Sequence, residues 1–133
     1  MKQLTILLLL IFGLGGPAFA LEKIPFSHER FAELQAQGAI VLVDVYADWC
    51  STCAKQQSAL DAWRKANPDK TLHVLEIDFD QDKALVRHFR APRQSTLLLY
   101  RGEEQFWYSV AESRPEVIAT ELDKAFNFEA KKR

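Results

Sequence analysis

The sequence has little cysteine: Cys50 and Cys53 are the only two among 133 residues. Two cysteines supply half of the ligands that a zinc or iron–sulfur site usually needs. The histidines His28, His73 and His88 have no metal-ligand spacing to them. A cysteine-ligated site would therefore require a second chain, and we predict neither a metal nor any other cofactor.

The sequence also has almost no net charge, with 17 basic and 18 acidic side chains giving a formal charge of −1. Acidic and basic residues are interspersed, so no basic surface for nucleic acid is expected. The run Lys131–Arg133 is short and typical of a solvated chain end. We therefore exclude nucleic acid as a partner.

An apolar segment opens the chain, in residues 1–20 (MKQLTILLLLIFGLGGPAFA). Lys2 precedes an apolar run from Leu4 to Leu14, and the segment ends on Ala18-Phe19-Ala20, an A-x-A cleavage pattern. These features predict a secretory signal peptide over residues 1–20, cleaved after Ala20, and a periplasmic mature protein. Export places the cysteines in an oxidising compartment, where a dithiol can exist as a disulfide.

An uncleaved membrane anchor is the alternative interpretation of this segment. A spanning helix needs roughly 20 apolar residues, whereas here three glycines and Pro17 interrupt the run. No cysteine follows the run to accept a lipid. We therefore expect residues 21–133 to form one domain that does not insert into the membrane.

The residues after this segment alternate between helical and strand patterns. Helices are predicted over residues 27–37, 50–66, 82–89 and 115–126, and strands over 39–46, 71–79, 95–100 and 104–110, with Gly102 turning the last hairpin. A βαβ unit followed by a hairpin and a closing helix predicts an α/β fold. Its centre is a mixed four- to five-stranded sheet with helices on both faces.

The cysteine pair is predicted at the carboxyl end of a central strand, where a helix begins, and α/β folds place their chemistry there. A helix N-terminus favours an ionised sulfur, so Cys50 is the predicted attacking thiol. Cys53 lies one turn later and can resolve a mixed disulfide. A merely structural disulfide is less favoured, because a loop this short contributes little stability.

Asp44 interrupts an apolar strand six residues before Cys50. A buried carboxylate needs a partner or a raised pKa. Such a group could take the proton of the resolving thiol through a water molecule. Alternatively, Asp44 ends the strand and meets solvent, although Val45 and Tyr46 continue the strand pattern.

The stretch Val43-Asp44-Val45-Tyr46-Ala47-Asp48-Trp49-Cys50, followed by Ser51-Thr52-Cys53, resembles the active-site motif of the thioredoxin superfamily. Tyr-Ala-Asp-Trp-Cys is especially similar to the periplasmic C-terminal domain of DsbD-type proteins. The similarity extends over residues 26–127 and implies a thioredoxin-like fold. It also implies that Cys50 is the nucleophile, Cys53 the resolving thiol and disulfide partner, Asp44 the proton acceptor, and Trp49 an aromatic residue flanking the substrate.

The sequence departs from the family at the loop that faces the cysteines. Ser95 stands where the family has a cis-proline, in the segment Gln94-Ser95-Thr96 that the resemblance identifies as substrate-binding. Without proline a cis bond costs about 2.5–4 kcal/mol, so a trans Gln94–Ser95 bond is expected. Further departures are Ser51-Thr52 between the cysteines, Ser58 in place of a kinking proline, Glu76 in place of a lysine, and the lack of a glycine near Val110.

Together these features predict a monomeric thiol–disulfide oxidoreductase that exchanges protein disulfides. The resemblance to reductant-conducting domains favours the reducing direction, with a membrane protein as the electron donor. The altered loop motivates an alternative, a redox-weak binding or chaperone-like module that has kept the fold. A metal or cluster protein is a third interpretation, and it would be coloured or metal-bound on purification.

Overall fold

The computed structural model describes residues 23–128. The predicted signal peptide and the basic C-terminal run lie outside these residues. The elements in chain order are β1 (Lys23–Pro25), α1 (His28–Ala36), β2 (Ile40–Tyr46), α2 (Ser51–Ala66), β3 (Leu72–Asp78), α3 (Lys83–His88), β4 (Thr96–Arg101), β5 (Glu104–Val110) and α4 (Pro115–Asn127). No helix within residues 23–128 has the length and hydrophobicity needed to cross a membrane.

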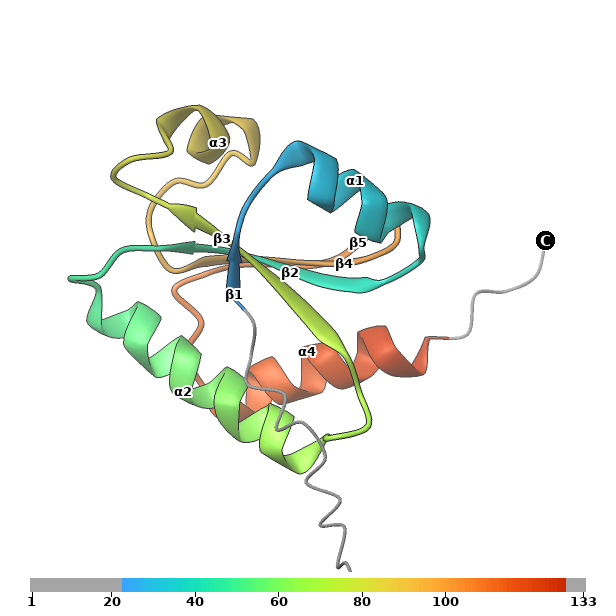
Figure 1. Ribbon diagram of the computed structural model, residues 1–133. Coiled ribbons are helices and arrows are strands. Elements are labelled where there is room, and N and C mark those ends of the chain that lie inside the picture. Colours follow the sequence, from blue (N-terminus) through green and yellow to red (C-terminus); the bar gives the residue numbers. More distant parts are fainter. Residues whose placement is uncertain (1–22, 129–133) are drawn as a thin grey trace, which may run out of the picture.

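A five-stranded mixed sheet in the order β1-β3-β2-β4-β5 forms the centre of the fold (Figure 1). Strands β1, β3 and β2 are parallel, whereas β4 pairs antiparallel with both β2 and β5. Since β2 is hydrogen-bonded on both sides and covered on both faces, its residues are nearly all buried. This explains the apolar, β-branched composition of the strand.

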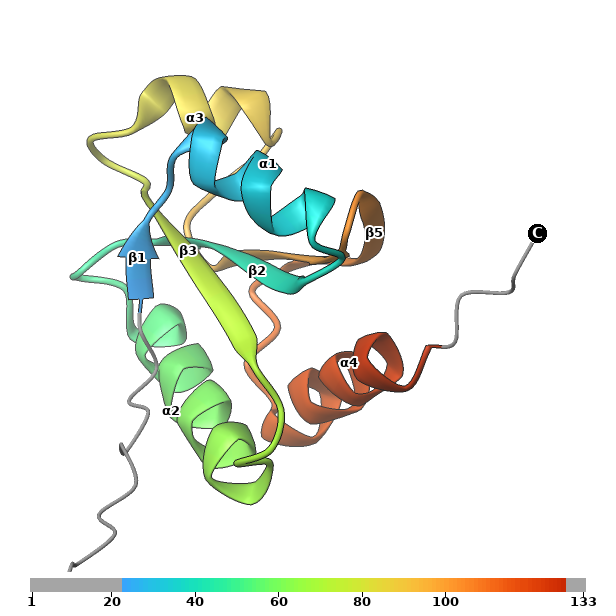
Figure 2. The same ribbon diagram turned by 45° about the vertical axis from the view of Figure 1, so that its right-hand side comes forward.

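Helices cover the sheet in two layers (Figures 1 and 2). Helices α2 and α4 lie on one face, and α1 and α3 lie on the other. Side chains alternate along β2: Leu42 packs with α2 and α4, whereas Val41 and Val43 pack toward the opposite layer. Asp44, next in the alternation, therefore faces α2.

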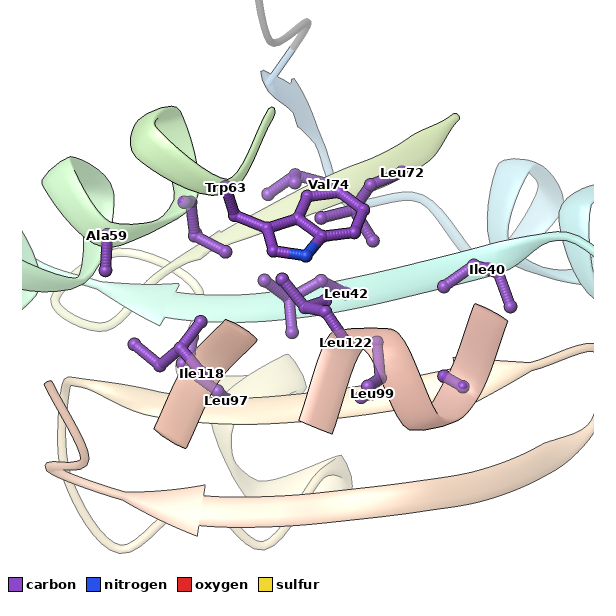
Figure 3. Packing of buried hydrophobic residues seen from close by; sticks show 12 residues of the cluster. Ile40, Leu42, Ala59, Trp63, Leu72, Val74, Leu97, Leu99, Ile118 and Leu122 are labelled. Carbon is purple, nitrogen blue, oxygen red and sulfur yellow. The ribbon is translucent and has the colours of Figure 1, made fainter. Parts of the chain in front are cut away.

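The larger core cluster fills the space between the sheet and the helices α2 and α4 (Figure 3). Trp63 of α2 and Leu122 of α4 pack there with Leu42 and Leu99 of the sheet. Leu60, Leu99 and Leu122 are completely buried. This packing fixes α2, and with it the cysteine pair at its start, against β2.

The structure confirms the predicted thioredoxin-like α/β fold, including the four helices and the four strands expected from the sequence. One strand, β1, was not predicted. It has only three residues at the sheet edge, and one of them is Pro25, so its composition carries no strand pattern. Backbone pairing with β3 defines it instead.

Candidate active site

The turn between β2 and α2 carries the cysteines. The backbone N–H of Cys50 donates to the carbonyl of Ala47, which closes the turn at 3.1 Å. Cys50 is the N-cap of α2, with an extended backbone, and its Sγ accepts a 3.1 Å hydrogen bond from the N–H of Cys53. The first sulfur therefore lies where the unpaired N–H groups and positive dipole of the helix favour negative charge.

Cys50 and Cys53 form a disulfide, with their Cα atoms 5.2 Å apart. Only 6% of Cys50 and 3% of Cys53 is exposed, so the pair is accessible over a small area. A cavity of about 370 Å³ opens beside the two residues, and its lining also includes Ala47, Asp48 and Gln57.

Asp44 is fully buried in the middle of β2, so it does not end the strand or meet solvent. Its Oδ2 accepts a 2.6 Å hydrogen bond from Nε2 of Gln57, while Oδ1 has no partner among the described residues. Burial raises the pKa of Asp44 from 3.8 to about 6, although the Gln57 hydrogen bond opposes the rise. A carboxyl with this pKa can accept and release a proton near neutral pH.

Two further charges act on Asp44 from neighbouring strands. Glu76 of β3 lies directly opposite Asp44 in the β2–β3 register, and its negative charge raises the Asp44 pKa further. Lys23 of β1 lies 3.6 Å from the Glu76 carboxylate, and its positive charge lowers the Asp44 pKa. Glu76 thus acts on Asp44 and is held by a cation from the edge strand.

Trp49 immediately precedes Cys50 and is 64% exposed, which makes it a surface residue and not a core residue. Its Nε1 donates a 2.7 Å hydrogen bond to Oδ2 of Asp80. This bond fixes an aromatic surface next to Cys50. An exposed, anchored indole is suited to contact a visiting polypeptide.

The segment Gln94-Ser95-Thr96 is mostly buried. Gln94 is half-buried, whereas Ser95 and Thr96 are fully buried, so the last two offer no side-chain surface to a substrate. No peptide bond within residues 23–128 is cis, which confirms the predicted trans bond before Ser95. Instead, Ser95 has a left-handed backbone with φ of 60°.

Two residues that shift the pKa of Asp44 were not predicted from the sequence. They are Gln57 and Lys23. Gln57 follows Cys53 by four residues, so it lies one helical turn further along the same side of α2. That spacing is a signal that could have identified it. Lys23 gives no such signal, because its position depends on the pairing of β1 with β3.

Within residues 23–128 there is no group of three or more histidine, cysteine, aspartate or glutamate side chains arranged to hold a metal ion. The two cysteines are bonded to each other. A disulfide between neighbouring cysteines can take part in thiol–disulfide exchange.

Comparison with known proteins gives the same result as the fold and site. The family model described as Thioredoxin matches residues 22–124. Thioredoxin of Chlamydia trachomatis is 30% identical over 84 residues, covering 63% of this chain and 79% of the relative. The thiol:disulfide interchange protein DsbD of Haemophilus ducreyi is 32% identical over 94 residues, but the match covers 63% of this chain and only 16% of that protein.

Solved structures show the same fold. The crystal structure of Trxlp from Edwardsiella tarda has a TM-score of 0.66 and 40% identity, covering 72% of this chain and 93% of that one. Thioredoxin from Trypanosoma brucei brucei has a TM-score of 0.68 at 16% identity, covering 85% of this chain and 98% of that one. The second likeness supports the fold alone.

A mixed sheet with a CxxC disulfide at the start of a helix defines the class of thioredoxin-fold thiol–disulfide oxidoreductases. The chain belongs to the thioredoxin family.

We propose that disulfide exchange by this pair proceeds in two displacements, with Cys50 as the attacking thiol and Cys53 as the resolving thiol. In the reduced protein, a Cys50 thiolate attacks one sulfur of a partner disulfide, forming a mixed disulfide and releasing one partner thiolate. Cys53, as a thiolate, then attacks Sγ of Cys50, which forms the Cys50–Cys53 disulfide and releases the second partner thiolate. The partner gains two electrons and the pair loses two, and the reverse sequence oxidises the partner.

Proposed function

We propose that the protein is exported to the bacterial periplasm and there reduces disulfides of other proteins. Two observations support the proposal. The chain is similar to DsbD, a thiol:disulfide interchange protein, and residues 1–20 have the pattern of a secretory signal peptide. Since this chain matches only a small part of those relatives, the proposal concerns this one domain. Its substrates are protein disulfides, and it acts as a monomer.

A membrane protein supplies the electrons under this proposal. The periplasm is kept oxidising, so a reducing dithiol there must be re-reduced after each turnover. The cysteine pair takes electrons through the same exchange reaction that it performs on its clients. Cys50 forms a mixed disulfide with the donor, and Cys53 completes the transfer.

Thiol trapping in a bacterial host tests location and direction together. The full chain is expressed, acid-quenched and alkylated, and its mature N-terminus is determined by mass spectrometry. We expect a mature chain starting at Leu21 that is mainly reduced in cells with a membrane reductant donor, and mainly oxidised in cells without one. Retention of residues 1–20, or the same oxidised fraction in both strains, would contradict the proposal.

Reduction of insulin by dithiothreitol separates this function from the redox-weak binding module. We expect the wild-type protein to accelerate insulin reduction and Cys50→Ser to give only the rate of dithiothreitol alone. Equal rates for the two proteins would favour the binding module.

Size-exclusion chromatography with light scattering measures the molar mass of the mature protein in solution. We expect the mass of one chain, and the mass of two or more chains would contradict the proposed monomer.

A further inference from the structure

The side chain of Gln56 is fully buried one turn after Cys53, and it does not line the cavity beside the cysteines. Its Nε2 donates two hydrogen bonds, to the carbonyl of Ser95 at 3.1 Å and to the carbonyl of Glu112 at 2.7 Å. Both acceptors are backbone carbonyls, so the NH₂ end of the amide must face them. A buried amide with this geometry joins two loops that are distant in sequence to the active-site helix.

These two loops are also joined to each other and to β2. The Ser95 N–H donates to the carbonyl of Val45 at 2.7 Å, and the Ala111 N–H donates to the carbonyl of Ser95 at 2.9 Å. Ser95 therefore contacts the end of β2 through its N–H and the start of α2 through its carbonyl. The turn that carries Cys50 runs between these two attachment points.

The backbone at these positions needs such support. Ser95 and Ala111 have φ angles of 60° and 62°, a left-handed conformation that non-glycine residues disfavour. Such conformations persist where the surrounding structure determines them. Gln56 supplies two of the hydrogen bonds that hold this arrangement, and Arg114 supplies further support by pairing with the Glu112 side chain.

We propose that Gln56 is a positioning residue for disulfide exchange with polypeptides. It holds the loop of residues 93–96, which is attached to the end of β2 and to α2, in one shape. The resemblance to the thioredoxin family assigns contact with an extended substrate chain to residues 94–96, so this inference rests on the proposed function. The effect on the reaction passes through this loop and not through the sulfurs. The rate of exchange with a small disulfide that does not reach the loop should therefore not depend on Gln56. The rate of exchange with a protein disulfide should depend on it.

The test compares Gln56→Met and Gln56→Leu with the wild-type protein on two substrates, insulin and the small aromatic disulfide 5,5′-dithiobis(2-nitrobenzoate). Both variants are apolar and near in size to glutamine, and both lack the donor. We expect kcat/KM for insulin to fall about tenfold, through a higher KM at similar kcat, and the rate with the small disulfide to change less than twofold. Gln37→Met, an exposed glutamine-to-methionine change at the end of α1, is the matched control.

Two kinetic results would overturn the proposal. An equal fall with both substrates would mean that Gln56 supports the cysteine pair itself, and no fall with either would make it a packing residue only. The inference assumes that the protein performs disulfide exchange, and the small disulfide also tests that assumption. A wild-type protein that does not react with the small disulfide would contradict the oxidoreductase function itself, not the role of Gln56.

Amide hydrogen exchange on the wild-type protein tests the same inference without a substitution. If Gln56 holds the loop on α2, the N–H groups of Ser95 and Ala111 should exchange as slowly as those in the middle of α2. Exchange of these two groups that is a hundredfold faster than in α2 would show a loop that opens independently, contrary to the proposal.

Discussion

The side-chain amide of Gln57 donates a 2.6 Å hydrogen bond to the buried carboxyl of Asp44. Gln57 lines the cavity beside the cysteines, whereas Asp44 does not. The Gln57 side chain therefore contacts Asp44 and also borders the cavity beside the cysteines.

Removing the amide should raise the Asp44 pKa. The Gln57 hydrogen bond stabilises the ionised carboxylate, so Gln57→Leu should move the Asp44 pKa from about 6 to a higher value. Carbon-13 NMR of the Asp44 carboxyl, titrated in the oxidised protein, measures this directly. Gln37→Leu is the control and should leave the titration unchanged. A pKa that stays the same or falls in Gln57→Leu would show that the hydrogen bond does not favour the charged form.

Asp44→Asn should stabilise the oxidised protein at neutral pH. The folded protein keeps the Asp44 proton up to about pH 6, whereas an aspartate in the unfolded chain loses its proton near pH 3.8. The folded state therefore binds more protons within this window, and stability falls as pH rises through it. Loss of the charge should add about 1–3 kcal/mol to the free energy of unfolding at pH 7.5.

Urea unfolding at pH 4 and pH 7.5 checks this expectation. The advantage of Asp44→Asn over the wild-type protein should be present at pH 7.5 and largely absent at pH 4, because the wild-type carboxyl is then neutral in the folded state. An equal difference at both values would assign the effect to packing instead of charge.

Asp44→Asn should also slow release of the substrate. Asparagine cannot accept the proton of Cys53, so the second displacement should slow by about 10²-fold, within the usual range for general base catalysis. Mixed-disulfide formation by Cys50 should change little. Rapid-quench kinetics resolve the two steps, and the difference between the proteins should narrow below pH 6, where wild-type Asp44 is protonated. Equal slowing of both steps would remove Asp44 from this role.

Trp49→Ala should weaken exchange with proteins while leaving the fold intact. The indole is mostly exposed and donates a hydrogen bond to the Asp80 side chain. We expect kcat/KM for insulin to fall about tenfold, or about 1.4 kcal/mol, which is the size of effect expected when a contributing interface residue is truncated. Trp49→Phe, which keeps an aromatic surface, should retain most of the activity. Unchanged kinetics in Trp49→Ala would exclude the side chain from substrate contact.

The sequence was sufficient to predict the part of the site that is local in the chain. The patterns of a buried strand, a turn and a helix over residues 40–66 place Cys50 where a helix begins, and the structure makes it the N-cap of α2. The burial of Asp44 followed from the apolar residues on both sides of it. These predictions needed only periodicity and capping rules.

The remaining parts of the site depend on tertiary packing. Gln56 and Gln57 are adjacent polar residues of one helix, and only the position of α2 over the sheet directs the first to Ser95 and the second to Asp44. The effect of Lys23 arises from a three-residue edge strand. The left-handed backbone of Ser95 likewise depends on hydrogen bonds from other elements.

The pKa of the Cys50 thiol in reduced protein tests the central claim most directly. It is measured in Cys53→Ala from the pH dependence of iodoacetamide alkylation, with an exposed thiol in the same helix, made by Ser58→Cys in a Cys50→Ser/Cys53→Ser chain, as control. Because Cys50 caps α2, its pKa should lie clearly below the roughly 8.5 of an ordinary thiol, which the control should approach. A Cys50 pKa at or above that of the control would contradict activation by the helix start.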